Sequence, residues 1–244
     1  LSRSRGRKGR NVSGIVVLDK AKGLSSNAAL QEVKRIYGAN KAGHTGSLDP
    51  LATGVLPICL GEATKVSQYL LESDKKYRAR LKLGIRTDSA DSEGIVTERC
   101  EDFVVKAEDV EKALQSFRGE IEQIPPMHSA LKVDGVPLYK LARKGQTVAR
   151  VPRKITVYSI ELTEFAADEI ELEIACSKGT YIRTIADDLG QALACGAHII
   201  GLHRTQAGAF TEEDCVSIKV LMQEKNTLGM QGIDEILVPM DRAI

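Results

Sequence analysis

Apolar and polar residues alternate strictly in several short stretches of the chain, a period typical of strands that bury one face. The clearest examples are residues 76–83 and 170–176. Residues 155–162 follow a similar pattern, and the short apolar run at 14–19 is typical of a buried strand. Residues 197–210 are predicted to form a last core strand.

Other stretches repeat apolar residues every three or four positions, the period of an amphipathic helix. Ser25 or Ser26 can cap a helix that runs to about Tyr37 and ends at Gly38. Further helices are predicted at residues 62–72, at 106–117, from about 182 to the stop at Gly196, and in the tail after 210. The helix at 62–72 is expected to turn Val66, Tyr69 and Leu70 inward.

Turn signals separate these elements. The polar stretch 86–94 is interpreted as a connection that can reach a substrate, since its carboxylates lack the spacing of a calcium-binding loop. Asp134-Gly135 is a hairpin signal that follows a strand candidate at 127–133. Hairpins separate the strands as often as helices do. The pattern therefore predicts an α+β fold with a mixed, largely antiparallel sheet flanked by helices.

The composition is that of an ordinary globular protein, with 43% hydrophobic and 27% charged residues in a chain of 244. No apolar run approaches the roughly 20 residues needed to span a bilayer, and the first residues of the sequence lack the apolar core of a signal peptide. A cytoplasmic protein is therefore expected. The five cysteines are scattered and never spaced as C-x-x-C, so buried thiols are expected instead of disulfides or a zinc site.

Charge is distributed unevenly, although the net charge of +1 by itself gives no support to nucleic-acid binding. Residues 1–10 form a basic arm that is expected to be flexible. A second cluster lies at 140–154. Both suit a phosphate backbone, but both are equally compatible with a solvated surface. The basic residues are Arg3, Arg5, Arg7, Lys8 and Arg10 in the arm, and Lys140, Arg143, Lys144, Arg150, Arg153 and Lys154 in the second cluster.

The loop at residues 43–54, GHTGSLDPLATG, is the richest in chemistry. It presents the carboxylate of Asp49 five residues after the imidazole of His44. Pro50 holds Asp49 away from helical geometry. Gly, Asp, Pro and Thr are also ordinary turn residues, so a simple turn is one interpretation. An apolar stretch follows at 55–60, and a functional side chain on a loop anchored by buried structure is the alternative.

The stretch GHTGSLDPLATGVLPICLGEATK resembles the central motif of the bacterial tRNA pseudouridine-55 synthases, the TruB family. The resemblance covers roughly residues 11–210 and implies the catalytic core of the pseudouridine synthases. Ala21 departs from the family pattern, which usually has proline there. The other matching motifs are Lys20-Ala21-Lys22-Gly23, Lys76-Tyr77-Arg78, Gly179-Thr180-Tyr181-Ile182-Arg183-Thr184 and Gly201-Leu202-His203-Arg204.

The resemblance implies an isomerase that detaches uracil from its ribose at N1 and rejoins it through C5. Asp49 would be the nucleophilic carboxylate and Arg183 its basic partner. Whether Asp49 attacks C6 of the base, attacks C1′ of the sugar or removes a sugar proton stays open. Because no external group is added, neither a cofactor nor a metal is implied.

The family resemblance also implies roles in holding the RNA. A uridine in folded RNA must be flipped out of its stack before it can react. His44 would stabilise the rearranged loop, and Tyr77 would stack on the flipped base and take part in proton removal at C5. Tyr181 and Leu202 would close the pocket, and Lys20 is matched near the site.

The expected substrate is the uridine at position 55 in the T-arm stem-loop of tRNA. The expected domains are the basic arm, a catalytic domain at 11–210 and a helical tail at 211–244, with the family's C-terminal PUA domain absent from this chain. No obligate protein partner is implied, so a monomer is expected. The sequence is also compatible with an RNA chaperone or guide-RNA scaffold, a role that can accompany catalysis. The lack of H-E-x-x-H spacing disfavours a third class, a metallohydrolase.

Overall fold

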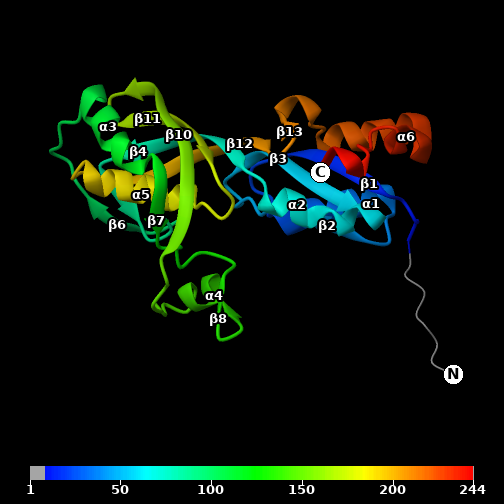
Figure 1. Cartoon of the computed structure of the whole chain (residues 1–244), viewed down its shortest axis with the longest axis horizontal. Helices are drawn as coiled ribbons and strands as arrows, with labels where there is room; N and C mark the ends of the chain where they lie inside the picture. Colours follow the sequence, from blue (N-terminus) through cyan, green and yellow to red (C-terminus); the bar gives the residue numbers. More distant parts are fainter. Residues whose placement is uncertain (1–8, 244) are drawn as a thin grey trace. The chain divides into compact units, whose positions relative to one another are not determined.

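The computed structural model of the chain describes residues 9–243. Contacts among these residues divide them into two compact units. The first unit comprises the residues up to Lys75 and those from His203 onward, and the second comprises Lys76–Leu202. Strand β12 (Ala197–Ala207) contributes residues to both units (Figure 1). The predicted domain boundaries at residues 10 and 210 stay predictions.

The first unit is built on a small mixed sheet. Strand β1 (Gly14–Lys20) pairs antiparallel with β3 (Thr53–Leu60), and β2 (Ala42–His44) also pairs antiparallel with β3. The end of β12 runs parallel to β3 and antiparallel to β13 (Phe210–Thr211). The helices of this unit are α1 (Ser26–Tyr37), α2 (Ser67–Glu72) and α6 (Ile218–Asp234), with 3-10 turns η1 (Gly61–Lys65), η3 (Glu212–Asp214) and η4 (Met240–Ala243).

Helix α1 begins and ends where its sequence predicts. The hydroxyl of Ser25 accepts a hydrogen bond from the amide of Ala28 and caps the first turn. Gly38 ends the helix in the left-handed conformation, with φ of 59°. Its apolar residues Leu30, Val33 and Ile36 are buried. This helix packs against β2, β3 and α6, so it supports the segment that leads into the loop at 43–54.

The second unit is built on a sheet in which β12, β4, β11, β10 and β7 are neighbours in that order. In this unit helix α3 (Ala107–Leu114) packs against β10 and against α5. The elements of the unit as a whole are β4 (Lys75–Leu83), β5 (Ile85–Thr87), β6 (Val96–Arg99), α3 (Ala107–Leu114), η2 (Gln115–Phe117), β7 (Gly119–Gln123), β8 (Lys132–Val133), β9 (Val136–Pro137), α4 (Leu138–Ala142), β10 (Arg153–Ala166), β11 (Glu169–Cys176) and α5 (Ile182–Ala192).

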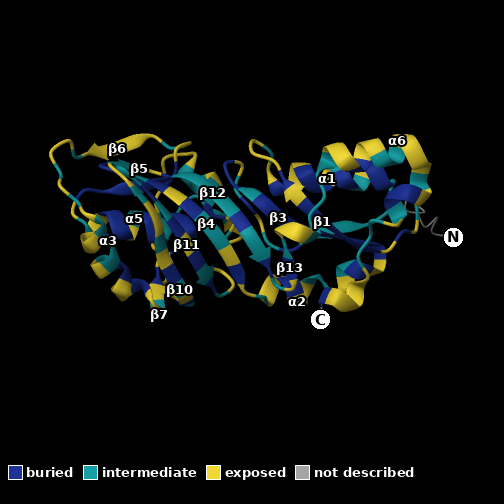
Figure 2. Cartoon of the chain, turned by 90° about the horizontal axis from the view of Figure 1, so that it is seen from above, coloured by how far each residue is buried: buried dark blue, intermediate teal, exposed yellow. Residues whose placement is uncertain are grey.

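The predicted α+β class, with a mixed and largely antiparallel sheet flanked by helices, is confirmed. Burial follows the predicted alternation along β4, where Ala79, Leu81 and Leu83 are buried and Arg80 is exposed. Figure 2 shows the same alternation of buried and exposed residues along the strands of this unit. The five cysteines are free thiols, and Cys59, Cys176 and Cys195 are buried as expected, whereas Cys100 and Cys215 are partly exposed.

Two local predictions were wrong. Tyr69 is 49% exposed instead of turned inward, because a 3-10 turn precedes α2 and changes the face that the helix presents. Residues 127–133 are mostly irregular, and only Lys132–Val133 forms a strand. The hairpin turn after it is confirmed, with positive φ at Asp134 and Gly135.

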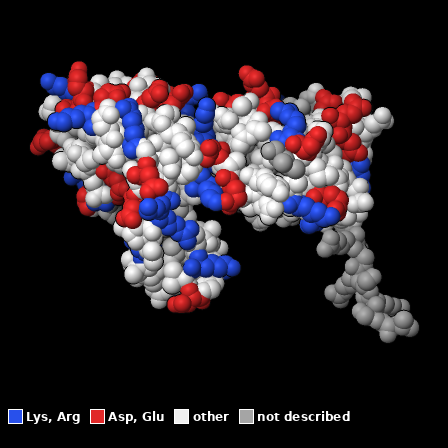
Figure 3. Space-filling view, in the orientation of Figure 1, with Lys and Arg blue, Asp and Glu red and all other residues white. Residues whose placement is uncertain are grey.

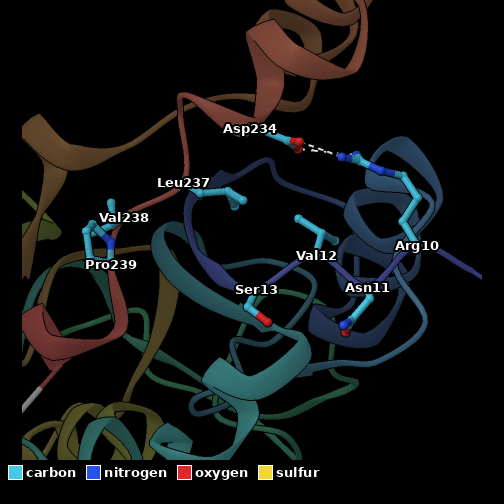
Figure 4. Close-up of a pocket in the computed structure, with 8 residues that line it drawn as sticks. All are labelled: Arg10, Asn11, Val12, Ser13, Asp234, Leu237, Val238 and Pro239. Atoms are coloured by element: carbon cyan, nitrogen blue, oxygen red, sulfur yellow. Dashed lines mark hydrogen bonds and ion pairs between the residues drawn. The ribbon is translucent and has the colours of Figure 1, made fainter.

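The basic arm falls almost wholly outside the described residues, because the description begins at Gly9. Its last residue, Arg10, forms an ion pair with Asp234 at the end of α6. The two side chains face each other beside a pocket lined by residues 10–13, 234 and 237–239 (Figure 4). None of the predicted site residues lines this pocket. Among the described residues, no helix is long and apolar enough to cross a membrane.

Candidate active site

The loop that carries Asp49 is a tight turn tied to the structure around it. The amide of Ala52 donates to the carbonyl of Asp49 at 3.0 Å, and Pro50 occupies the second position of this turn. The amide of Gly23 donates to the carbonyl of Pro50 at 2.8 Å. Asp49 itself is half-buried. Its carboxylate is therefore presented from a backbone with little freedom to move.

Ser26 in the first turn of α1 clamps the residue before Asp49. The amide of Leu48 donates to Ser26 Oγ at 2.7 Å, and this hydroxyl donates to the carbonyl of Leu48 at 3.0 Å. Both bonds are buried. One side chain thus satisfies both polar groups of Leu48, as a neighbouring strand would, and fixes the backbone beside the carboxylate.

Replacement of Ser26 by alanine is expected to loosen this loop while the fold persists. The substitution leaves two buried backbone groups without a partner, which costs about 1–3 kcal/mol for each such group. For the reaction that the resemblance implies, we expect lower kcat with unchanged RNA affinity, measured by initial rates and filter binding. Ser25→Ala is the matched control, since it removes the cap of the same helix without touching the loop. Equal loss of kcat in both variants would contradict the role of Ser26.

Two buried cations lie against the same loop. Lys20 is 0% exposed, and its Nζ donates to the carbonyls of Ala52 at 2.6 Å and Ala21 at 3.0 Å. Arg204 is 1% exposed, and it donates to the carbonyls of Val55 and Gly46. The structure therefore brings Lys20 to the loop of Asp49, and its place in the site stays a prediction.

His44 ends strand β2, opposite Ile58 of β3. Burial lowers the pKa of its imidazole, and the positive charge of Arg204 lowers it further. The described structure gives its buried Nδ1 no hydrogen-bond partner. His44 therefore offers a neutral, flat ring at neutral pH, which suits stacking on a base.

Arg183 lies in the first turn of α5 and is 6% exposed. It donates to the carbonyls of Ser89 at 3.1 Å and His128 at 2.8 Å. Its Nη1 also lies 3.7 Å from the carboxylate of Asp91. The guanidinium is thus held in place by the connection at 86–94 and by the segment before the β8–β9 hairpin.

Asp91 organises that connection, and sequence reasoning missed it. Its carboxylate accepts hydrogen bonds from Ser89 Oγ at 2.6 Å and from the amide of Glu93 at 3.0 Å. Its carbonyl accepts one from the hydroxyl of Thr87 at 2.7 Å. The signal was present in the run of Asp and Ser residues, which form such local turns. The connection therefore serves as a buried support for Arg183.

Tyr181 directly precedes α5, and its backbone is fixed by the side-chain amide of Gln123. The Tyr181 amide donates to Gln123 Oε1 at 2.8 Å, and Gln123 Nε2 donates to the Tyr181 carbonyl at 3.0 Å. Tyr77 on β4 and Leu202 on β12 are half-buried. The roles of these three predicted residues, and the pairing of Asp49 with Arg183, stay predictions.

Comparison with known proteins supports the resemblance over the whole chain. Residues 34–182 match the model of the TruB family pseudouridylate synthase (N terminal domain), and residues 183–244 match the tRNA pseudouridylate synthase B C-terminal domain. The tRNA pseudouridine synthase B of Vibrio vulnificus (strain YJ016) is 53% identical over 247 residues, covering 99% of this chain and 78% of that protein. The protein of the same name from Pectobacterium atrosepticum is 52% identical, covering 100% of this chain and 79% of that protein.

Solved structures give the same result. A chain in the crystal structure of a Cbf5-Nop10-Gar1 complex matches with a TM-score of 0.74 and 30% identity, and the match covers 95% of this chain but 61% of that chain. A chain of an H/ACA RNP bound to a substrate RNA containing 2′-deoxyuridine matches with a TM-score of 0.73 and 26% identity, covering 100% of this chain and 67% of that one. With the family models and the close relatives, these matches show that the chain belongs to the TruB family of pseudouridylate synthases.

Proposed function

We propose that this protein converts the T-loop uridine of tRNA, position 55 in standard tRNA numbering, to pseudouridine. The observation that carries the proposal is the carboxylate of Asp49, held on a rigid loop by Ser26 and Lys20 within the family's most distinctive motif. The relatives named as tRNA pseudouridine synthase B support the choice of tRNA as substrate. The reaction would take place in the cytoplasm, where tRNA is.

The reaction rearranges bonds within one nucleotide. The N1–C1′ bond breaks and a C5–C1′ bond forms, while the hydrogen on C5 leaves to solvent and N1 takes up a proton. Since every bond is exchanged inside the uridine and with water, the chemistry needs no cofactor. It needs a carboxylate beside the ribose and base, a route for the C5 proton, and a pocket that keeps the detached base from leaving.

We assign these tasks to the residues that the family motif matches. Asp49 is the catalytic carboxylate, which attacks C6 or C1′ as a nucleophile or acts as a base on the sugar. Arg183 is the basic group proposed as its partner. Tyr77 stacks on the flipped base and takes part in removal of the C5 proton. Tyr181 and Leu202 close the pocket.

His44 and Lys20 complete the assignment from the first unit. The neutral imidazole of His44 stacks in the rearranged T-loop, where base–aromatic stacking is worth about 1–3 kcal/mol for each base. Lys20 acts on the backbone of the loop instead of on the substrate, because its Nζ is buried against the carbonyl of Ala52.

The segment around α4 is proposed to contact the RNA backbone. Figure 3 shows Lys and Arg side chains on the part of the second unit that extends from its sheet. The guanidinium of Arg143 lies over the ring of Tyr139, 5.5 Å from the ring centre. Lys154 is different, because it is paired with Glu120 at 2.8 Å. The basic cluster of 140–154 therefore divides into cations available for phosphates and cations already paired within the protein.

Replacement of Lys140, Arg143 and Lys144 by alanine is expected to weaken tRNA binding and flatten its salt dependence. Each cation that contacts a phosphate contributes about one unit to the slope of log K against log salt. Binding measured over a salt series checks this expectation. Lys154→Ala is the matched control and should leave the slope almost unchanged. If the triple variant keeps the full slope, the segment is only a solvated surface.

An isolated T-arm stem-loop provides the test of the proposed function. The protein is incubated with this RNA, and pseudouridine is mapped by carbodiimide labelling followed by primer extension. We expect a single modified position, the T-loop uridine. If intact tRNA is modified but the isolated stem-loop is not, the recognised region extends beyond the T-arm. An unmodified tRNA would refute the proposed function.

A further inference from the structure

We propose that Arg204 is a positioning residue for this reaction, whose buried guanidinium ties together the two ends of the loop that carries Asp49. The inference rests on the proposed function of that loop. Arg204 lies on β12, and the two carbonyls to which it donates hydrogen bonds belong to the first unit.

The hydrogen bonds of Arg204 span the loop. Its Nε donates to the carbonyl of Val55 at 2.7 Å, and its Nη2 donates to the carbonyl of Gly46 at 3.3 Å. These carbonyls stand on either side of residues 47–54 in the sequence. The planar guanidinium presents its donors in a fixed geometry, so it can hold both ends at a defined separation, which a lysine ammonium cannot do.

Two glycines with positive φ lie where the loop meets Arg204, and one of them, Gly54, is required for the close approach of the two backbones. Gly54 has φ of +98°, and a Cβ at this position would lie 2.3 Å from the carbonyl oxygen of Arg204. Gly46 has φ of +101°, and a Cβ there would lie 3.7 Å from Arg204 Nη1. Any side chain at Gly54 would force β12 and the loop apart. The lack of a side chain at Gly54 therefore leaves room for the backbone of Arg204.

The buried guanidinium of Arg204 is not paired with a carboxylate of the described residues. Within residues 9–243, the structure gives it no ion pair with a carboxylate, although its side chain is 1% exposed. A buried cation without such a partner is costly, and an apolar residue of similar volume is often at least as stable. The carbonyls of the loop are the groups that compensate its charge. Packing alone does not explain why a cation occupies this position, whereas a role in holding the loop does.

The residue before Arg204 supports the same arrangement. His203 Nδ1 lies 2.7 Å from the hydroxyl of Thr53, and its Nε2 lies 2.7 Å from Glu212 Oε1. His203 and Arg204 pair in parallel register with Thr53 and Gly54. Two successive residues of β12 thus hold the end of the loop, one through a side chain of the loop and the other through its backbone.

Two substitutions separate the charge of Arg204 from its bidentate geometry. Arg204→Lys keeps the charge but cannot reach both carbonyls, and Arg204→Met removes both. We expect kcat for tRNA to fall in both variants, by roughly 100-fold in R204M, since small displacements of a reacting group carry costs of that order. KM should change little. Amide hydrogen exchange at Ala52, whose N–H closes the Asp49 turn, should quicken in both variants.

The ionisation of His44 distinguishes the two variants. The charge of Arg204 helps to lower the pKa of His44, so the pKa measured by NMR should rise in R204M and stay low in R204K. Phe210→Leu, in the core of the same unit, controls for loss of stability. F210L should keep the wild-type kcat when its Tm falls as much as that of R204M. Its amide hydrogen exchange at Ala52 should also stay as slow as in the wild type.

The proposal is overturned if R204M turns over tRNA as the wild type does, or if F210L at a matched Tm loses as much kcat. If the wild-type protein forms no pseudouridine, the proposed function fails, but hydrogen exchange at Ala52 still decides whether Arg204 holds the loop. Unchanged exchange in R204M would then refute the inference by itself.

Discussion

Asp49→Asn is expected to abolish pseudouridine formation, lowering kcat by at least about 10⁴-fold, as removal of a nucleophile does in other enzymes. The substitution keeps the shape of the side chain and removes its negative charge. The turn of the loop depends on the backbone of Asp49 and on Leu48, so it should persist. Affinity for tRNA should therefore persist. Initial rates from quenched reactions give the loss of kcat, and filter binding gives the affinity.

Asp19→Asn is the matched control for that experiment. Asp19 is an exposed carboxylate on β1 of the same unit, and its substitution changes the net charge equally. It should leave kcat unchanged. If Asp49→Asn retains turnover within about tenfold of the wild type, Asp49 cannot be the nucleophile.

Arg183→Met is expected to have the second largest effect, and it acts in two ways. It removes the partner of the buried carboxylate of Asp91, and breaking a buried pair in this manner costs about 3–5 kcal/mol of folding free energy. It also removes the proposed cationic partner of the nucleophile, for which a loss of roughly 10²–10³-fold in kcat is typical of a missing electrostatic contact. Thermal unfolding and initial rates measure the two effects.

Two further variants separate stability from chemistry. Arg86→Met breaks the ion pair of Arg86 with Asp187 in the same unit and should lower Tm while kcat persists. Asp91→Asn leaves Arg183 its hydrogen bonds to two carbonyls and should also keep most of the turnover. If R86M lowers kcat as much as R183M does, the effect of Arg183 is structural only.

The elements that sequence predicted best are those with local signals. Helix α1 is bounded by Ser25 and Gly38, and both act through residues within four positions along the chain. The alternation along β4 reports directly which side chains face the core. The stretch 127–133 was misjudged because its apolar residues indicate burial without indicating a partner strand, and the structure pairs only its last two residues.

The parts of the site that sequence did not predict depend on contacts between distant residues. The bonds of Ser26 with Leu48, Gln123 with Tyr181 and Arg204 with Gly46 join residues 22, 58 and 158 positions apart. Periodicity and turn chemistry carry no information on such pairs. Asp49 itself was found because it lies in a long motif that resembles a family. Lys20 and Arg204 also lie in matching motifs, but the motifs do not reveal their bonds to the loop, and Ser26 and Gln123 lie outside these motifs.

Release of tritium from tRNA labelled at C5 of its uridines measures pseudouridine formation directly, because the new C5–C1′ bond forms only if the hydrogen on C5 is lost. With wild-type protein, tritium release should rise to one equivalent for each tRNA and then stop, and D49N should release none. Release from many uridines, or the same release with D49N, would contradict it.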